Sequence, residues 1–284
     1  MASVINTNIA SLNSQRSLNK TQNAVNTAIQ RLSSGLRVNS SKDDAAGLAI
    51  AERMNAQIKG MNVAIRNAND AVSLAQVADG ALGQISEMAQ RMRELAVQSA
   101  NATNGEKDRE SLNQEYTQLA LEITRTINGT KFNGLAIIGS DAQTPLTFQI
   151  GANTDTTTER IELTGMSDLS ADTTVTDVTG STIDGTDATN ALAAMDFIDT
   201  MLDTINSQRA VYGAAQNRFD SVISSLQVSV ENQTAARSRI MDADFAAETA
   251  NLTSAQVLQQ AGQAMLAQAN SAPSGVLALL RNLG

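Results

Sequence analysis

The chain has 284 residues, of which 42% are apolar and only 2% aromatic, and its 29 Asp and Glu against 20 Lys and Arg give a net charge of −9. This acidic balance, without any basic run, argues against nucleic acid and anionic membranes as partners. Because there is no Cys and no His, thiol chemistry, imidazole catalysis, disulfides and Cys or His metal sites are excluded. We also expect neither a membrane span nor a cleaved signal peptide, since no apolar stretch approaches the roughly 18 residues of a span and the start lacks a basic segment before an apolar one.

The opening segment, residues 5–36, has the spacing of an amphipathic helix on a background rich in Asn, Ser, Thr and Gln. Its apolar positions follow heptad-related steps: Ile5, Ile9, Leu12, Leu18, Val25, Ile29, Leu32 and Leu36. Such a helix is marginal by itself, so we expect it to need partners. Gly35 predicts a break, after which Asp43 and Asp44 place carboxylates at the start of the next helix. This capping role is preferred to a metal or acid–base role for the Asp pair.

Residues 45–100 predict one long helix, because apolar or small residues recur there in steps of three and four. The positions are Ala51, Met54, Ile58, Met61, Ile65, Ala68, Val72, Ala75, Leu82, Ile85, Ala89, Met92 and Ala96. Only Asp79 breaks the series, and no proline interrupts it. Such a helix would be roughly 80 Å long, longer than the about 50 Å diameter of a compact globule of this size. We therefore expect a rod of helices.

The middle of the chain predicts a shorter helix and a small β element. A turn signal at residues 101–105 precedes an apolar face over 107–128, which predicts a third helix antiparallel to the second. Residues 146–163 alternate apolar and polar side chains around a polar turn, as a β-hairpin does. Residues 164–187 are rich in Thr, Asp, Gly and Ser and predict an exposed irregular loop.

The helical period returns from about residue 188 and predicts a fourth helix to about 235. A last helix follows the segment 237–244, and Pro273 and Gly275 are expected to break it. Apolar stripes at both ends of the chain favour pairing of the terminal helices. The expected fold is mainly α: an elongated antiparallel helical bundle or coiled coil with paired terminal helices and one small β-hairpin.

Several short motifs are specific enough to indicate a family. They are Ile5-Asn-Thr-Asn8, Gln30-Arg-Leu-Ser-Ser-Gly-Leu-Arg37, Asp43-Asp-Ala-Ala-Gly-Leu-Ala-Ile50, Arg93-Glu-Leu-Ala-Val-Gln-Ser-Ala-Asn101, Phe132-Asn-Gly134, Ile150-Gly-Ala-Asn153, Arg239-Ile-Met-Asp-Ala-Asp-Phe245, Gln259-Gln-Ala-Gly262, Leu266-Ala-Gln-Ala-Asn270 and Leu279-Leu-Arg281. Together they resemble bacterial flagellin over both terminal regions and most of the chain.

The resemblance implies a non-enzymatic structural subunit, without a cofactor, that polymerises into an extracellular flagellar filament for swimming. It implies a terminal coiled-coil domain, D0, from residues 1–44 and 238–284, and a rod domain, D1, from 45–163 and 188–237. The segment 164–187 stands where larger relatives insert outer domains. Family members are exported unfolded through a flagellar type III secretion channel. The implied partners are other copies of the chain, an export chaperone at the C-terminal helix, flagellar cap and hook-junction proteins, and Toll-like receptor 5.

The resemblance also implies site residues on two surfaces. The receptor face, which also contacts the next subunit along a protofilament, comprises Gln90, Arg91, Leu95, Gln98 and Glu115. The spacing alone instead favours a partly exposed edge of the helical bundle. The terminal assembly positions are Ile5, Ile9, Leu12, Val25, Ile29, Leu32, Leu252, Leu258, Met265, Leu266 and Leu280.

Three alternatives remain open at this point. A hook–filament junction protein or a capping-related relative shares the terminal coiled coils but forms only a short zone. A soluble coiled-coil adaptor does not account for the paired terminal motifs. An enzyme is the weakest alternative, because the Ser and Lys residues form no recognisable nucleophile motif.

Overall fold

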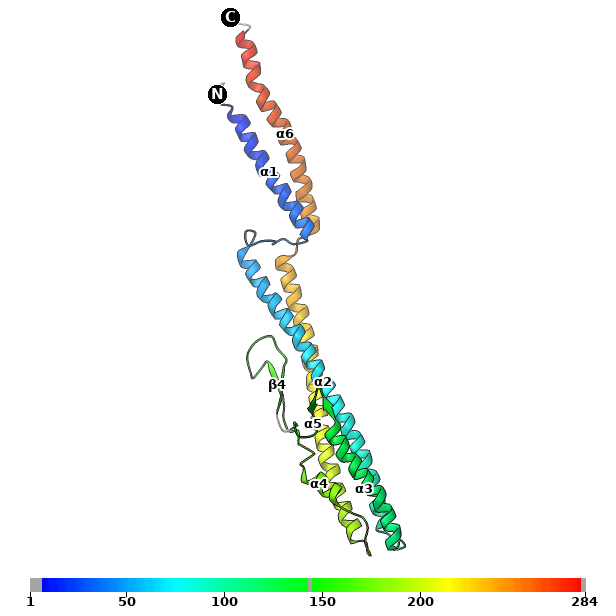
Figure 1. The fold of residues 1–284 in the computed structure, drawn as a ribbon. Helices are drawn as coiled ribbons and strands as arrows, with labels where there is room; N and C mark the ends of the chain where they lie inside the picture. The colour runs from blue at the N-terminus through cyan, green and yellow to red at the C-terminus, as the bar shows by residue number, and fades with distance from the viewer. Residues whose placement is uncertain (1–6, 143–144, 282–284) are drawn as a thin grey trace. The chain divides into compact units, whose positions relative to one another are not determined.

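The computed structural model describes residues 7–142 and 145–281, with the backbone alone for 273–281. The helices are α1 (Ile9–Ser34), α2 (Ala45–Ser99), α3 (Glu106–Gly129), α4 (Thr173–Gly180), α5 (Thr189–Met241) and α6 (Phe245–Arg281). The strands are β1 (Lys131–Phe132), β2 (Leu135–Ala136), β3 (Leu146–Gln149) and β4 (Arg160–Leu163) (Figure 1). The prediction of a mainly helical chain with a small hairpin is confirmed.

The chain forms two compact units. The terminal unit contains Met1–Ala56 and Asn232–Gly284, and the central unit contains Gln57–Glu231. The terminal unit thus combines α1 and α6 with the first part of α2 and the last part of α5. The central unit contains the rest of α2 and α5 together with α3, α4 and the strands.

Local signals explain where the first helices begin and end. The Asn8 Oδ1 accepts a hydrogen bond from the Ser11 N–H at 3.1 Å, which caps α1, and Gly35 ends that helix in a left-handed conformation (φ 71°). The predicted role of Asp44 is confirmed, because its Oδ1 accepts from the Gly47 N–H at 2.8 Å at the start of α2. Asp43 instead orders the preceding turn, because its carboxylate accepts hydrogen bonds from the N–H and the hydroxyl of Ser40. These hydrogen bonds hold the pKa of the Asp43 carboxyl below its ordinary value.

The central unit is built on the stripe of α2. Every position of the predicted stripe is buried or half-buried, and α2, α3 and α5 share one core. Its largest fully buried side chains include Tyr116, Tyr212, Phe219, Leu82 and Ile85. Many α2 positions in this core are alanines, so neighbouring helices can approach closely. Most of the large apolar side chains of the central unit are therefore buried against other helices of the same unit.

Asp79, the interruption of the α2 stripe, has a partner on α5. Its Oδ1 accepts from the Arg209 Nε at 2.9 Å, and both side chains are partly exposed. The ion pair of Arg93 with Asp199 lies farther along the same two helices. Residue numbers rise on α2 as they fall on α5 between the two pairs, so the helices are antiparallel. The break in the stripe is therefore an interhelical ion pair at the edge of the core.

The predicted hairpin is confirmed with its residues. Strands β3 and β4 are antiparallel, with Phe148 opposite Ile161 and Leu146 opposite Leu163. The Phe148 ring meets the Phe219 ring of α5 edge-on, with 5.4 Å between centroids, which joins the hairpin to the core. A second small hairpin, β1 with β2, turns at Asn133, a signal that the prediction of one hairpin did not use.

Two predictions about local structure are wrong. Segment 164–187 is not an exposed irregular loop, because it contains α4 and buries Val175 and Val178 in the core. The Tyr116 hydroxyl ties it down with a hydrogen bond to the Val178 carbonyl and another shared with the Ser181 hydroxyl. The second error concerns Pro273 and Gly275, which do not end the last helix, since α6 continues to Arg281.

Candidate interaction surfaces

The terminal helices α1 and α6 lie side by side (Figure 1). The inward positions of α1 follow heptad steps, at Ser11, Ser14, Leu18, Thr21, Val25, Ala28 and Leu32. Those of α6 do the same, at Glu248, Leu252, Ala255, Gln259, Gly262, Leu266 and Ala269. Most of these side chains are small or polar, so the seam between the two helices, the terminal seam, buries little apolar surface. Gly262 faces Leu18, whose Cδ1 would lie 3.4 Å from an added Cβ.

Polar contacts cross the terminal seam along its length. At one end, the Asn8 Nδ2 donates to the Ala269 carbonyl at 2.7 Å. The neighbouring Ser11 hydroxyl donates to the Asn270 Oδ1 at 2.7 Å. Midway, the amide of Gln259 donates to the side-chain oxygen of Gln22. Residue numbers rise on one helix as they fall on the other, so the pair is antiparallel and polar groups help to set its register.

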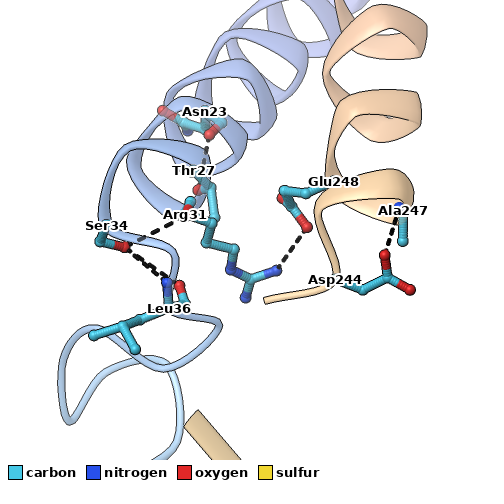
Figure 2. A network of polar contacts seen from close by, with 8 residues as sticks. All are labelled: Asn23, Thr27, Arg31, Ser34, Leu36, Asp244, Ala247 and Glu248. Carbon is cyan, nitrogen blue, oxygen red and sulfur yellow. Dashed lines mark hydrogen bonds and ion pairs between the residues drawn. The ribbon is translucent and has the colours of Figure 1, made fainter. Parts of the chain in front are cut away.

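A buried carboxylate marks the other end of the terminal seam. Glu248 is 8% exposed, and its Oε2 lies 3.8 Å from Arg31 Nη1 (Figure 2). The Arg31 Nε is buried without a hydrogen-bond partner among the described residues. Asp244 caps the start of α6 by accepting from the Ala246 and Ala247 N–H groups. The ion pair is loose but partly desolvated, so each charge depends on the other.

Seven large apolar side chains of α1 and α6 point away from the terminal seam. They are Ile9, Leu12, Ile29, Phe245, Val257, Leu258 and Met265. Ile9 is 71% exposed and Met265 is 62% exposed, and both are among the predicted terminal assembly positions. A self-sufficient helix pair would instead bury large apolar residues of this kind between the helices.

The predicted assembly positions therefore divide into two groups. Ile9, Leu12, Ile29, Leu258 and Met265 lie on the outer faces, whereas Val25, Leu32, Leu252 and Leu266 lie in the terminal seam. Ile5 lies outside the described residues, and Leu280 lies where only the backbone is described. Heptad spacing predicted one stripe and could not distinguish these two faces, because neighbouring positions on a helix satisfy similar spacings.

A hydrogen-bonded joint connects the ends of α1 and α5. The Arg37 N–H donates to the Met241 carbonyl at 2.6 Å, its guanidinium donates to the Ile240 carbonyl at 2.7 Å, and the Ala243 N–H donates to the Gly35 carbonyl at 2.9 Å. Arg37 thus satisfies carbonyls at the negative end of the α5 dipole. Sequence reasoning did not assign it a role, because its partners are about 200 residues away in the chain.

The predicted receptor face lies on α2 and α3 of the central unit. The Arg91 guanidinium donates to Glu94 at 2.9 Å and to Glu115 at 2.9 and 3.0 Å, and these contacts raise the pKa of Arg91 above its ordinary value. Both Arg91 and Glu115 are about half exposed. Gln90 and Gln98 are exposed. The structure therefore brings these four predicted residues onto one accessible region.

Leu95 differs from the expectation of partial exposure, which is wrong. It is 1% exposed and belongs to the core, because the neighbouring helices cover its side of α2. Sequence reasoning missed Val97, which is exposed and lines a shallow groove with Gln90, Arg93, Glu94 and Gln98. The Arg93 guanidinium beside Asp199 holds the pKa of that carboxyl below its ordinary value.

Among the residues that the structure describes, no group of three or more His, Cys, Asp and Glu side chains has the arrangement of a metal site. In residues 7–142 and 145–281, none of the helices combines the length and the apolar content that a membrane crossing requires.

Comparison with known proteins assigns the family. The N-terminal helical region of bacterial flagellin matches residues 5–140, and the C-terminal helical region matches residues 195–280. A flagellin of Halalkalibacterium halodurans is 45% identical over 278 residues, covering 98% of this chain and 100% of that protein. A Bacillus subtilis flagellin is 40% identical over 306 residues, covering 98% and 99%. A crystal structure of Bacillus cereus flagellin is 31% identical with a TM-score of 0.48, covering 61% of this chain and 94% of that chain. On the sequence matches at both ends and along nearly the full length, the chain belongs to the bacterial flagellin family.

Proposed function

We propose that the chain is the structural subunit of a bacterial flagellar filament, polymerising outside the cell to serve swimming motility. The observation that carries the proposal is the set of large apolar side chains on the outer faces of α1 and α6, beside a terminal seam made mostly of small and polar residues. Family membership supports the same function. Full burial of a large apolar side chain contributes roughly 1.5–3 kcal/mol, so several such residues supply a driving force for association on the order of 10 kcal/mol before its entropic cost.

The experiment that tests this function is seeded polymerisation of the purified chain, followed by electron microscopy. Long filaments are expected from the wild-type chain. The triple variant Ile9→Ser, Leu258→Ser and Met265→Ser should remain a folded monomer, because all three side chains are exposed. Leu121→Ser removes an equally exposed apolar side chain from α3 and serves as the control. Persistent wild-type monomers would instead favour a hook–filament junction or capping-related protein.

The domain assignment belongs to this proposal. The terminal domain D0 comprises residues 1–44 and 238–284, and D1 comprises 45–163 and 188–237. Pairing of α1 with α6 supports a D0 made from both ends of the chain. The joint at Arg37 lies within the proposed D0, because Arg37 and its partner Ile240 both fall inside these bounds.

A structural, non-catalytic role fits the local chemistry. Five carboxylates have pKa values below their ordinary range: Asp43, Glu122, Asp155, Asp187 and Asp199. Each carboxylate is accessible to solvent, and each shift follows mainly from hydrogen bonds donated by a nearby Ser, Thr or Arg. These groups come from separate segments, so none needs a catalytic explanation.

Recognition by Toll-like receptor 5 is a second proposal, located at Gln90, Arg91, Gln98 and Glu115. Support comes from the exposure of these side chains and from the fixed position of the Arg91 guanidinium between two carboxylates. Arg91→Ala should weaken signalling by the purified monomer about tenfold without unfolding it. Arg125→Ala is the control, because Arg125 is also an exposed Arg paired with a nearby Glu. Equal signalling by the two variants would contradict this assignment.

Export partners are proposed at α6. We expect passage unfolded through the type III secretion channel, a chaperone bound to α6 before assembly, and contacts with flagellar cap and hook-junction proteins. The exposed apolar side chains of α6 support this proposal, since they need cover before polymerisation. Deletion of residues 250–284 should leave a soluble monomer that forms no filaments and no longer binds the chaperone.

A further inference from the structure

Helix α6 continues through a proline, which requires a physical explanation. Pro273 lies well inside α6 and has no backbone N–H. The carbonyl four residues earlier, that of Ala269, therefore loses its donor within the helix, and a proline ring also crowds that carbonyl. Such a position usually kinks or ends a helix. The carbonyl of Ala269 needs a donor from elsewhere if the helix is to continue.

Asn8 supplies that donor from the other end of the chain. Its Nδ2 donates to the Ala269 carbonyl at 2.7 Å, across a sequence separation of 261 residues. Its Oδ1 simultaneously accepts from the Ser11 N–H at 3.1 Å and caps α1. The amide of Asn can donate at one atom and accept at the other in this way, whereas the carboxylate of Asp has no proton to give. The Ser11 hydroxyl donates a hydrogen bond to Asn270, the residue after Ala269, and so holds α6 beside this contact.

We propose that Asn8 is a positioning residue that allows α6 to continue through Pro273, so that residues 274–281 become helical only when the start of α1 is docked beside Ala269. The two ends of the chain then order each other. This inference deepens the proposed filament function and rests on it, because neighbouring copies stabilise the terminal pair. If either the start of α1 or the end of α6 is removed, the remaining terminal helix should therefore lack the contact that orders it for assembly.

The test uses full-length chains polymerised from seeds. Asn8→Ser keeps a good N-cap but is too short to reach Ala269, whereas Pro273→Ala restores the missing N–H. We compare wild type, each single variant and the double variant, with Asn19→Ser as a control on the exposed face of α1. The readouts are the critical concentration for polymerisation and hydrogen exchange of the amides of residues 274–281 in the filaments.

Asn8→Ser should raise both the critical concentration and the exchange rate of these amides about tenfold, as expected when one partly buried carbonyl is left unpaired. The double variant should match Pro273→Ala within about twofold, because the carbonyl then has its own donor. Pro273→Ser provides a second background with the same restored N–H. Asn19→Ser should behave as wild type.

Two results would overturn the inference alone: filaments of Asn8→Ser that match those of Asn19→Ser, or an Asn8→Ser defect of equal size with and without Pro273. The second result would mean that Asn8 acts only through α1. Failure of every chain to form filaments, wild type included, would overturn the proposed filament function and this inference with it.

Discussion

The terminal and central units use the same heptad spacing with opposite results. In the central unit, the stripe of α2 meets α3 and α5, and large side chains such as Tyr116 and Phe219 are fully buried. In the terminal unit, the facing positions of α1 and α6 are mostly small or polar, and Ile9 and Met265 are exposed. Spacing therefore determines that helices pair, whereas side-chain size determines whether the pair is complete without neighbours.

Net charge also distinguishes the two units. The terminal unit has nine Lys and Arg against six Asp and Glu, a net charge of +3, whereas the central unit has eleven against twenty-three, a net charge of −12. From Ile9 to Ser34, α1 contains three cations and no acid. The net charge of −12 on each central unit opposes close association of central units more strongly than the net charge of +3 opposes that of terminal units. The terminal unit is thus the part suited to burial in a polymer.

The largest expected effect separates a core residue from an assembly residue. Phe219→Ala removes a fully buried ring in contact with Phe148 and should lower the free energy of unfolding of the monomer by about 3–5 kcal/mol. Met265→Ala should change it by less than about 0.5 kcal/mol, since its side chain is already exposed, yet raise the critical concentration for polymerisation. Urea unfolding and sedimentation of filaments measure the two quantities. A similar loss of monomer stability in both variants would remove the contrast between the units.

The second effect concerns Tyr212 in the central unit. Its hydroxyl donates to the Ile137 carbonyl at 2.7 Å, and burial raises the pKa of Tyr212 from 10.0 to about 12. Because the pKa is higher in the folded state, the associated stability is fully present below pH 10 and is lost as the pH rises toward 12. We expect a loss on the order of 2 kcal/mol across this range, measured by urea unfolding at several pH values.

Tyr212→Phe is the control for that loss. It should cost about 1–2 kcal/mol at pH 7, since the Ile137 carbonyl loses its donor, and should weaken the dependence on alkaline pH. Tyr116 retains a contribution, because burial raises its pKa as well. An unchanged alkaline transition would contradict the assignment of this step to Tyr212.

The parts of the fold that could be predicted depend on local patterns. The stripe of α2, the cap at Asp44 and the β3–β4 hairpin follow from spacing, capping chemistry and alternation within short segments. The outward direction of Ile9 and the burial of Leu95 could not be predicted in the same way. Each depends on which side of its helix a distant segment covers, and neighbouring helix positions fit similar spacings.

The two incorrect local predictions have the same cause. Pro273 was expected to end α6 because proline removes an N–H, but the replacement donor is Asn8, at the opposite end of the chain. The Thr- and Asp-rich segment around Val175 and Val178 has the composition of a loop, yet Tyr116 of α3 provides hydrogen bonds that hold it on the core. Composition describes a segment's own preferences and contains no information about such distant partners.

The third expected effect tests the dependence of the terminal unit on polar contacts. Arg31→Met leaves the buried Glu248 carboxylate without its cation and should destabilise the terminal pair by about 1–2 kcal/mol. The critical concentration for polymerisation should therefore rise roughly tenfold. The double variant Arg31→Met and Glu248→Leu should recover most of the loss, because no unpaired charge remains. Equal defects in the single and double variants would show that packing of the Arg31 side chain, and not its charge, supports the pair.

The smallest expected effect lies at Asp79, where the central unit departs from its own apolar pattern. A double-mutant cycle of Asp79→Asn and Arg209→Gln, followed by urea unfolding, should give a coupling energy of about 0.2–1 kcal/mol that falls in high salt, because both side chains are partly exposed. The cycle isolates the ion pair from losses that each substitution causes alone. A coupling of zero would mean that the ion pair does not compensate for the missing apolar residue. A measurable coupling would make Asp79 a polar contact that favours one register of α2 and α5, the role that polar groups have along the whole terminal seam.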